Sequence, residues 1–276
     1  MPQSINQAFV KQYEREVHEA YQRQGSKLRG LVRNVTNVKG SSTVFQVAGK
    51  GTASTKTTHG QVPVMNVGHS SVECVLADYY AGDWVDKLDE LKINHDERAV
   101  LVNAGAYALG RKTDDLIIAA LATASTLTVA EANIGMTRDK VLSAFELLGK
   151  NDVPDDGDRC AVVGWKQWTE LMKIQEFANS QYVGPDELPF KNTQAKKWMN
   201  TLWMAHSALP IDGNDIRSCF WFHKASIGHA SGADVTTDIT WHGDRAAHFV
   251  NNMMSQGAAL IDGLGVVVIG CDETPD

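Results

Sequence analysis

Residues 48–61, AGKGTASTKTTHGQ, are rich in glycine, threonine and lysine, the residues of a phosphate-binding loop. Such a loop needs the spacing G-x-x-x-x-G-K-[S/T], because its glycines let backbone N–H groups surround the phosphates before a helix begins. Lys56 and Thr57 could end that motif, but Thr55 stands where its second glycine must be. The residues that follow, THGQVPV, contain a proline and valines and do not favour a helix. We therefore predict no nucleotide site here.

Other groups of residues could bind a metal ion. The carboxylates in 155–158 (DDGD) and 211–215 (IDGND) lack the distal glutamate of a calcium loop, so turns explain them better. Four histidines stand at no recognised zinc-ligand spacing from a cysteine or carboxylate: His223, His229, His242 and His248. The motifs HExxH, GxSxG and GxGxxG do not occur. The sequence therefore predicts no catalytic residue, no metal and no other cofactor.

The composition is that of a folded soluble protein made in the cytosol. Of the 276 residues, 43% are hydrophobic and 21% are charged. No apolar run reaches the roughly 20 residues of a membrane-spanning helix, and the N-terminus lacks the apolar core of a secretion signal. Four widely spaced cysteines without a C-x-x-C motif are expected to be reduced and buried: Cys74, Cys160, Cys219 and Cys271.

The charge is distributed unevenly along the chain. The first 60 residues hold nine Lys or Arg and three Glu, whereas the remainder holds 17 basic and 30 acidic side chains. A basic segment beside an acidic body fits nucleic-acid binding, contact with the acidic body of another copy, or a solvated segment with no partner. The charge alone leaves these alternatives open.

Several elements can be predicted from periodicity. Apolar residues recur every four positions after Ser4, which predicts an amphipathic helix at about 5–23 that needs a surface to lie on. β-Branched residues alternate with polar ones in 25–51 and again in 61–80, so residues 48–61 would form the tip of a long hairpin. The sequence of residues 97–122 predicts one helix. Glycine destabilises a helix, so the presence of Gly105 and Gly110 indicates that another backbone packs closely there.

The remainder of the chain predicts alternating helices and strands. Thr137 is expected to cap a helix that buries Val141, Leu142, Phe145 and Leu148 and ends at Gly149. Strands are expected within STLTVAEA and RCAVVG and in the closing LGVVVIGCDE, and a short helix within WKQWTELMKI.

The order of these segments resembles a known family. The resemblance is carried by GSKLRG, HGQVPV, HSSVECVLADYYAGDWVDKLDELK, YALGRKTDDLIIAALA, KNDVPDDGDRCAVV, CFWFHKASIGHASG and GVVVIGCDE, in that order. Over roughly residues 5–273 the chain is similar to the major capsid proteins of tailed bacteriophages with the Hong-Kong-97-like fold, specifically a short phage capsid protein family. It departs from the pattern at Gln61, where an acidic residue is expected, and in 176–205.

The resemblance implies an α+β capsid fold with named parts. Residues 1–35 would be the N-arm and 36–75 the extended E-loop hairpin. Residues 76–149 would form the peripheral domain, with a long spine helix at about 96–122. Residues 150–245 would form the axial domain, and 246–276 would be strands that return to the peripheral domain.

The resemblance also implies a function. The chain would self-assemble, in hundreds of copies, into hexamers and pentamers of an icosahedral phage head that encloses double-stranded DNA without sequence-specific binding. It would be assembled in the host bacterial cytoplasm and become part of the virion. A portal protein, and scaffolding or decoration proteins, are the further partners that the resemblance suggests.

Assembly then needs contacts between copies. We expect Lys50, Lys56, Thr57 and His59 at the hairpin tip to lie on a neighbouring subunit, near its acidic segment 83–97. The expected acidic partners in that segment are Asp83, Asp86, Asp89 and Glu90. Some capsids of this fold are covalently cross-linked from a lysine, but no residue match supports such a bond at Lys50 or Lys56.

The sequence leaves two alternative functions open. An encapsulin-like nanocompartment shell would use the same fold without a genome. A soluble nucleotide- or metal-dependent enzyme is the alternative of a different class, and it would be expected to remain a stable monomer.

Overall fold

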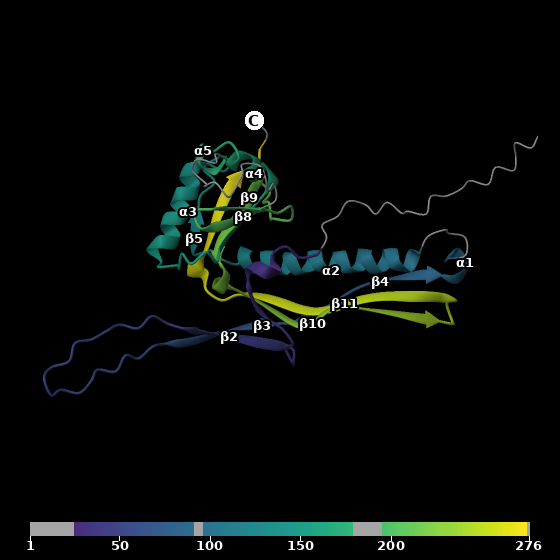
Figure 1. Cartoon of the computed structure of the whole chain (residues 1–276), viewed down its shortest axis with the longest axis horizontal. Coiled ribbons are helices and arrows are strands. Elements are labelled where there is room, and N and C mark those ends of the chain that lie inside the picture. Colours follow the sequence, from purple (N-terminus) through teal and green to yellow (C-terminus); the bar gives the residue numbers. More distant parts are fainter. Residues whose placement is uncertain (1–24, 91–95, 179–194, 275–276) are drawn as a thin grey trace, which may run out of the picture. The chain divides into compact units, whose positions relative to one another are not determined.

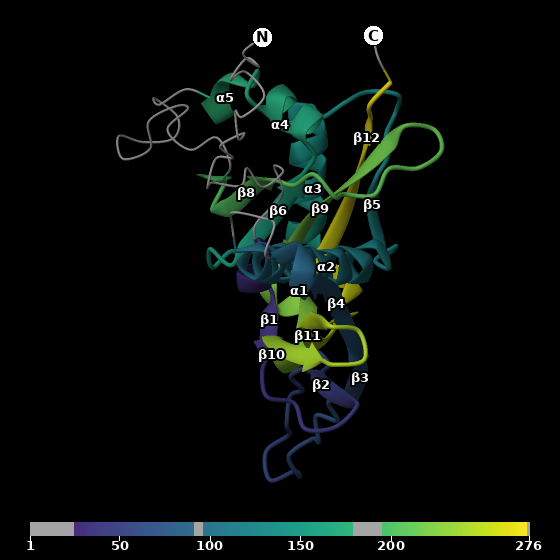
Figure 2. The same ribbon diagram turned by 90° about the vertical axis from the view of Figure 1, so that its right-hand side faces the viewer.

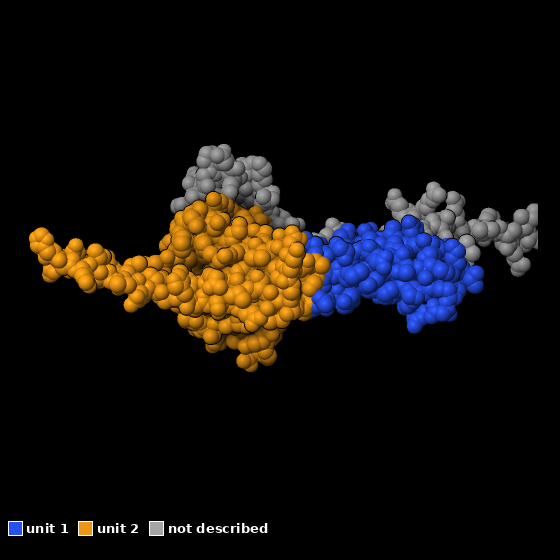
Figure 3. Space-filling view, turned by 90° about the horizontal axis from the view of Figure 1, so that it is seen from below, with its two compact units in different colours: residues 1–25, 78–111, 234–254 blue, residues 26–77, 112–233, 255–276 orange. Residues whose placement is uncertain are grey.

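A computed structural model of the chain describes residues 25–90, 96–178 and 195–274 (Figure 1). The helix predicted at 5–23 lies outside these described residues. The chain divides into two compact units, which Figure 3 shows in different colours. Unit 1 consists of Met1–Gly25, Asp78–Arg111 and Asp234–Met254, and unit 2 consists of Ser26–Ala77, Lys112–Ala233 and Ser255–Asp276.

The main sheet of unit 2 has six strands in the order β5-β12-β9-β6-β8-β7. The strands are β5 (Leu127–Val129), β6 (Arg159–Val163), β7 (Ala195–Trp198), β8 (Thr201–Ala205), β9 (Ile216–His223) and β12 (Val266–Asp272). All five residues of β6 are buried, as expected of a central strand in which four apolar residues follow Arg159. The strands predicted within STLTVAEA, RCAVVG and LGVVVIGCDE are confirmed.

The helices α3 (Arg138–Lys150), α4 (Trp165–Leu171) and α5 (Gln175–Ala178) lie beside this sheet (Figure 2). The largest buried side chains of the resulting core are aromatic: Phe177, Trp203, Phe220, Trp221 and Phe222. All four cysteines of the chain are free and buried, as predicted. This unit therefore has a complete apolar core of its own.

Helix α3 begins as predicted, because the Thr137 hydroxyl accepts a hydrogen bond from the Lys140 N–H. Val141 and Leu148 are buried, but the prediction that Leu142 points inward is wrong, since 47% of that residue is exposed. Leu142 lies about 100° around the helix from Val141, so the two cannot share one narrow face. The helix also continues through Gly149 to Lys150.

A second sheet has the order β1-β10-β11-β4. Its strands are β1 (Arg33–Val35), β4 (Ala77–Asp86), β10 (Ile227–His242) and β11 (Ala247–Leu260). Strand β1 runs parallel to β10, with Asn34 opposite His229. Short turns of 3-10 helix occur at Arg29–Leu31, Lys224–Ser226 and Gly263–Gly265.

The predicted hairpin is formed by β2 (Ser42–Ala48) and β3 (His69–Val75), which pair antiparallel over their full length. The last pair is closed by a 2.7 Å hydrogen bond from the Gly49 N–H to the Gly68 carbonyl. The connecting loop therefore covers 49–68, and the strand predicted from residue 61 begins only at His69. Pro63 has no N–H to give to a ladder, which disfavours pairing in this stretch.

The domain boundaries implied by the family resemblance stay predictions. The strand order adds one observation to them. Strand β12, at the C-terminal end of the chain, lies between β5 and β9 in the six-stranded sheet. The C-terminal strand thus shares its sheet with residues that were expected to be axial.

The long helix α2 (Glu97–Ala122) confirms the prediction at both ends, and it is preceded by the short α1 (Lys87–Glu90). Its two glycines are close to other residues for different reasons. A Cβ on Gly110 would lie 2.7 Å from the Gly25 Cα, so this glycine faces backbone as predicted. A Cβ on Gly105 would instead meet the side chain of Asn252, so the expectation of a facing backbone is wrong there.

The close approach of the Gly25 backbone to Gly110 gives a stability prediction. We expect G110A to lower the free energy of unfolding by about 1–3 kcal/mol, because a Cβ at 2.7 Å from the Gly25 Cα forces one of the two backbone segments to shift. The matched control is G149A in α3, where an added Cβ meets nothing within 4 Å. That variant should raise the free energy of unfolding by up to about 1 kcal/mol. Denaturant unfolding measures both, and a neutral or stabilising G110A would contradict the prediction.

Candidate assembly surfaces

The hairpin loop 49–68 carries the basic residues that the sequence predicted to contact another copy. Lys50 forms an ion pair with Asp152 of the same unit, with 2.8 Å between the Lys50 Nζ and an Asp152 carboxylate oxygen. The two side chains are 74% and 80% exposed. The Lys50 ammonium lowers the pKa of Asp152. Because both charges stay in water, this pair leaves the loop free to contact other molecules.

The rest of the loop forms a turn and presents apolar side chains. The Gly60 N–H donates to the Thr57 carbonyl over 3.0 Å, and His59 has a φ of 64°, in the left-handed region. Lys56 is exposed. Three apolar residues of the loop are more than half exposed: Val62, Val64 and Met65. The stretch is thus a loop with a basic and apolar surface, and no helix follows it as in a phosphate-binding loop.

The predicted acidic partners lie at the end of β4 and in α1. The Asp83 carboxylate accepts from the Trp84 N–H and the Asp86 carboxylate accepts from the Leu88 N–H, each over 2.8 Å. Glu90 is held by Arg98, whose hydrogen bond is the main cause that lowers the pKa of Glu90. Asp83, Asp86 and Asp89 are exposed.

These acidic residues belong to unit 1, whereas the hairpin belongs to unit 2. The predicted contact between them joins two copies, so it stays a prediction.

Sequence reasoning missed a buried polar cluster in unit 2. The Asp114 carboxylate of α2 accepts hydrogen bonds from the start of the described N-terminal segment and from the turn after β8. The donors are the Ser26 hydroxyl at 2.5 Å, the Lys27 and Leu28 N–H groups at 3.1 Å, and His206 Nε2 at 3.1 Å. The side chains of Asp114 and His206 are fully buried. The cluster therefore ties residues 26–28 to the helix.

The hydrogen bonds define the orientation of His206 and the proton that it donates. His206 Nδ1 accepts from the Ala208 N–H, so the proton lies on Nε2 and is donated to Asp114. Burial alone would raise the pKa of Asp114, but the hydrogen bonds from His206, Ser26, Leu28 and Lys27 together lower it. A signal for this site was present in the sequence, because a carboxylate within an apolar helix must find donors if it is buried. Their positions 86–92 residues away could not be read from it.

Two of the four histidines considered as metal ligands have hydrogen-bond partners within the chain. His223 Nε2 lies 3.2 Å from an Asp156 carboxylate oxygen. His229 lies 2.9 Å from the Asn34 side-chain oxygen and 3.1 Å from that of Gln256. Within residues 25–90, 96–178 and 195–274, no three His, Cys, Asp or Glu side chains gather in a metal-binding arrangement. In the same part of the chain, no helix is long and apolar enough to cross a membrane.

Comparison with known proteins identifies the family. The sequence profile of a family described as phage capsid protein matches residues 5–273. The chain belongs to this phage capsid protein family. No curated protein is similar enough in sequence to count as a relative. The prediction of a phage major capsid protein is thus confirmed, and the chain is a structural protein of this family.

Solved capsid structures share the fold of this phage capsid protein. The capsid of cyanophage P-SCSP1u gives a TM-score of 0.75 at 16% identity, covering 99% of this chain and 96% of that one. Mycobacterium phage Che8 gives 0.73 at 18% identity, covering 96% and 98%. The capsid of a native GTA particle computed with C5 symmetry gives 0.73 at 13% identity, covering 96% of both chains. The predicted α+β capsid fold is confirmed, while the names of its domains stay predictions.

The Asp114 cluster gives a prediction of pH-dependent stability. We expect D114N to lower the free energy of unfolding at pH 7 by about 2–4 kcal/mol, because charge-assisted hydrogen bonds from buried donors are lost. The pKa of Asp114 is lowered in the folded protein, so its contribution is complete above the unfolded pKa of about 3.9 and is lost as the pH falls through the folded value. The difference from wild type should therefore shrink below about pH 4.

Denaturant unfolding between pH 3 and pH 7 measures this dependence. The control is D115N, since Asp115 is the next residue of the same helix but is exposed. Its stability should stay within about 0.5 kcal/mol of wild type. A D114N deficit that is independent of pH would show that the carboxylate charge is not the cause.

Proposed function

We propose that this major capsid protein assembles into hexamers and pentamers of an icosahedral phage head. The loop 49–68 of each copy lies on a neighbouring copy, where Lys50, Lys56, Thr57 and His59 meet the acidic residues Asp83, Asp86, Asp89 and Glu90. The family match over residues 5–273 is the single observation that carries this proposal. It favours a phage capsid over an encapsulin-like shell and over a soluble enzyme.

The exposed apolar side chains of the loop support the contact. Val62 and Val64 are 74% and 82% exposed, and they sit on a hairpin loop that builds no core of its own. Exposed apolar groups on an extended loop favour association, because each Å² of apolar surface that becomes buried stabilises the complex by about 25 cal/mol. A neighbouring copy supplies that burial in a shell.

Repetition explains how weak contacts hold such a shell. An exposed ion pair contributes about 0–1 kcal/mol, which alone would not hold two proteins together. In a closed shell every copy makes the same contact, so the small contributions are multiplied over hundreds of copies. One chain must also fit both six-fold and five-fold rings, and loops absorb the difference.

The proposed shell encloses double-stranded DNA without reading its sequence. The chain has a net charge of −7, and a predominantly acidic surface does not hold the phosphate backbone tightly. A portal protein and scaffolding or decoration proteins complete the proposed set of partners. Assembly takes place in the host bacterial cytoplasm.

Shortening the hairpin tests the loop contact. Residues 50–67 are replaced by Asn-Gly, since the Gly49–Gly68 hydrogen bond already brings the two ends together. We expect the subunit to fold as before but to form few or no particles, because the contact with the neighbour is lost. Negative-stain electron microscopy and size-exclusion chromatography count the particles, and circular dichroism checks the fold.

The wild-type chain and a variant with a Gly/Ser loop of the same length are the controls. The Gly/Ser variant should also fail to assemble if the side chains matter. Wild-type yields of equally stable particles from the shortened chain would refute the loop contact. A wild-type chain that stays a 30.2 kDa monomer would refute the proposed function itself.

A charge exchange tests the acidic partners. We expect Lys56→Glu and Asp89→Lys to reduce particle stability separately, because each places like charges at the contact. Combining the two changes should restore stability, since opposite charges then face each other again. Thermal disruption of particles at low and high salt measures the effect, which should shrink at high salt. Lys197→Glu, at another exposed lysine, is the control, and a double variant no better than the singles would exclude this pairing.

A further inference from the structure

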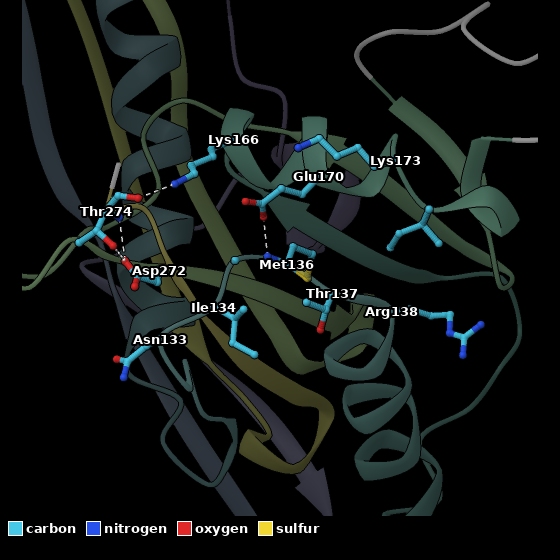
Figure 4. Close-up of a pocket in the computed structure, with 12 residues that line it drawn as sticks. Asn133, Ile134, Met136, Thr137, Arg138, Lys166, Glu170, Lys173, Asp272 and Thr274 are labelled. Carbon is cyan, nitrogen blue, oxygen red and sulfur yellow. Dashed lines mark hydrogen bonds between the residues drawn. The ribbon is translucent and has the colours of Figure 1, made fainter. Parts of the chain in front are cut away.

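A pocket of about 480 Å³ lies at the end of the six-stranded sheet in unit 2 (Figure 4). Its walls are the loop 133–137, the start of α3, one side of α4, and the last residues of the chain that the structure describes. Its volume falls within the range of about 300–1,000 Å³ that is typical of ligand pockets. Neither the proposed hairpin contact nor the Asp114 cluster uses it.

Buried hydrogen bonds hold the walls of this pocket in place. The Lys140 ammonium donates to the carbonyls of Glu131, Ile134 and Gly270, which fixes the loop against β12. The Glu170 carboxylate accepts from the Met136 N–H across the pocket, as the dashed line in Figure 4 shows. Gly135 permits this approach, because a Cβ there would lie 2.2 Å from a Glu170 oxygen. The pocket is thus preorganised in a single copy.

The pocket is lined by both signs of charge and by apolar groups. Its carboxylates have partners, since Glu170 accepts from the Met136 N–H and Asp272 accepts from Thr274. Lys166 donates one hydrogen bond to the Thr274 carbonyl, which leaves its remaining protons for another acceptor. Lys173 is exposed, and among the described residues only its backbone N–H, which donates to the Glu170 carbonyl, has a hydrogen-bond partner, so its ammonium is available. Ile134 is 50% exposed at the same opening. The pocket would therefore suit a carboxylate that stands next to an apolar side chain.

The loop 210–216, between β8 and β9, has that chemistry. Ile211 is 46% exposed, and Asp212 and Asp215 are exposed beside it. One Asp212 oxygen accepts from the N–H groups of Asn214 and Ile216, so the loop is held in shape by its own side chain. The Asp215 carboxylate has no hydrogen-bond partner among the described residues, which leaves it available for a cation.

The pocket and this loop lie on opposite sides of the end of β12. Asp272 and Thr274 line the pocket. Glu273, between them, faces the loop: its N–H donates to the Asp215 carbonyl and its carboxylate pairs with Arg217. Figure 2 shows the loop before β9 standing out beside β12. One domain thus carries a projecting loop on one side and a complementary pocket on the other, which is the arrangement of a head-to-tail contact that closes into a ring.

We propose that the loop 210–216 of one copy enters this pocket on the next copy around a ring. Ile211 covers Ile134, and Asp215 faces Lys166 and Lys173. The inference rests on the proposed function, because it assigns a ring contact within the hexamers and pentamers of the shell. It differs from the hairpin contact in both of its surfaces, so the two can fail independently.

Cysteine cross-linking of the full-length chain tests the contact. The variant carries Ile134→Cys and Ile211→Cys and is treated, as assembled particles, with a short bis-maleimide reagent. Denaturing gels should show a ladder of covalent multimers, because each copy is joined to the copies on both sides of it. The four native cysteines are buried, so the wild-type chain should stay monomeric on the gel.

The controls separate this contact from accidental cross-linking. Each single cysteine variant should give no ladder, since a head-to-tail contact does not bring two copies of one position together. Ile211→Cys with Leu142→Cys should also give none, although Leu142 is 47% exposed in the same unit. Adding Lys173→Glu to the reactive pair should reduce the ladder about tenfold or more, because two negative charges then meet at the rim.

The remaining outcomes distinguish failure of the ring contact from failure of the proposed function. Particles that form normally but give no ladder would overturn the ring contact and leave the proposed function standing. Dimers without higher multimers would overturn it as well, because they indicate a two-fold contact. A ladder that Lys173→Glu does not weaken would overturn the assignment of the acidic loop to this pocket. If the wild-type chain forms no particles, the proposed function fails and the ring contact falls with it.

Discussion

A single copy forms its own apolar core around the six-stranded sheet of unit 2. The stability of the rest of the molecule depends on this core. Trp203, Trp221 and Phe222 are fully buried there, between the sheet and its helices. A core of this size supplies most of the free energy that one chain needs to fold. Other parts can therefore stay extended without unfolding the whole.

The hairpin and strand β10 show what this freedom permits. The loop 49–68 leaves Val62 and Val64 in water, and the far half of β10 leaves Val235, Ile239 and Trp241 between 39% and 48% exposed. Surfaces of this kind lower the solubility of a monomer and are usually selected against. They are consistent with a protein that meets other copies of itself, since association buries what folding leaves exposed.

The sequence predicted the helices and strands better than the long-range contacts between them. Helix α2 was predicted at both ends, because a long periodic segment between polar flanks has one stable local solution. The bonds from Asp114 to residues 26–28 and to His206 were not predicted, since they join positions that only the folded chain brings together. The pocket beside Lys166 was missed for the same reason, because its lining comes from the loop 133–137, from α4 and from the end of β12, which are far apart in the sequence. The error at Leu142 also has a local cause, because Leu142 lies about 100° around the helix from Val141 and so off the face that α3 buries.

The contacts proposed between copies combine charged and apolar side chains, and this combination has a physical consequence. Charges such as Lys56 and Lys173 act over several ångströms and guide the encounter, but in water each adds little to the final affinity. The apolar groups beside them, Val62 in the hairpin loop and Ile211 in the loop before β9, contribute only after close approach, when water is excluded. A misplaced copy gains the charge attraction without the apolar contact and can dissociate. Many weak contacts of this mixed kind therefore favour a closed, regular shell over an irregular aggregate, because correct closure is the arrangement that satisfies all of them at once.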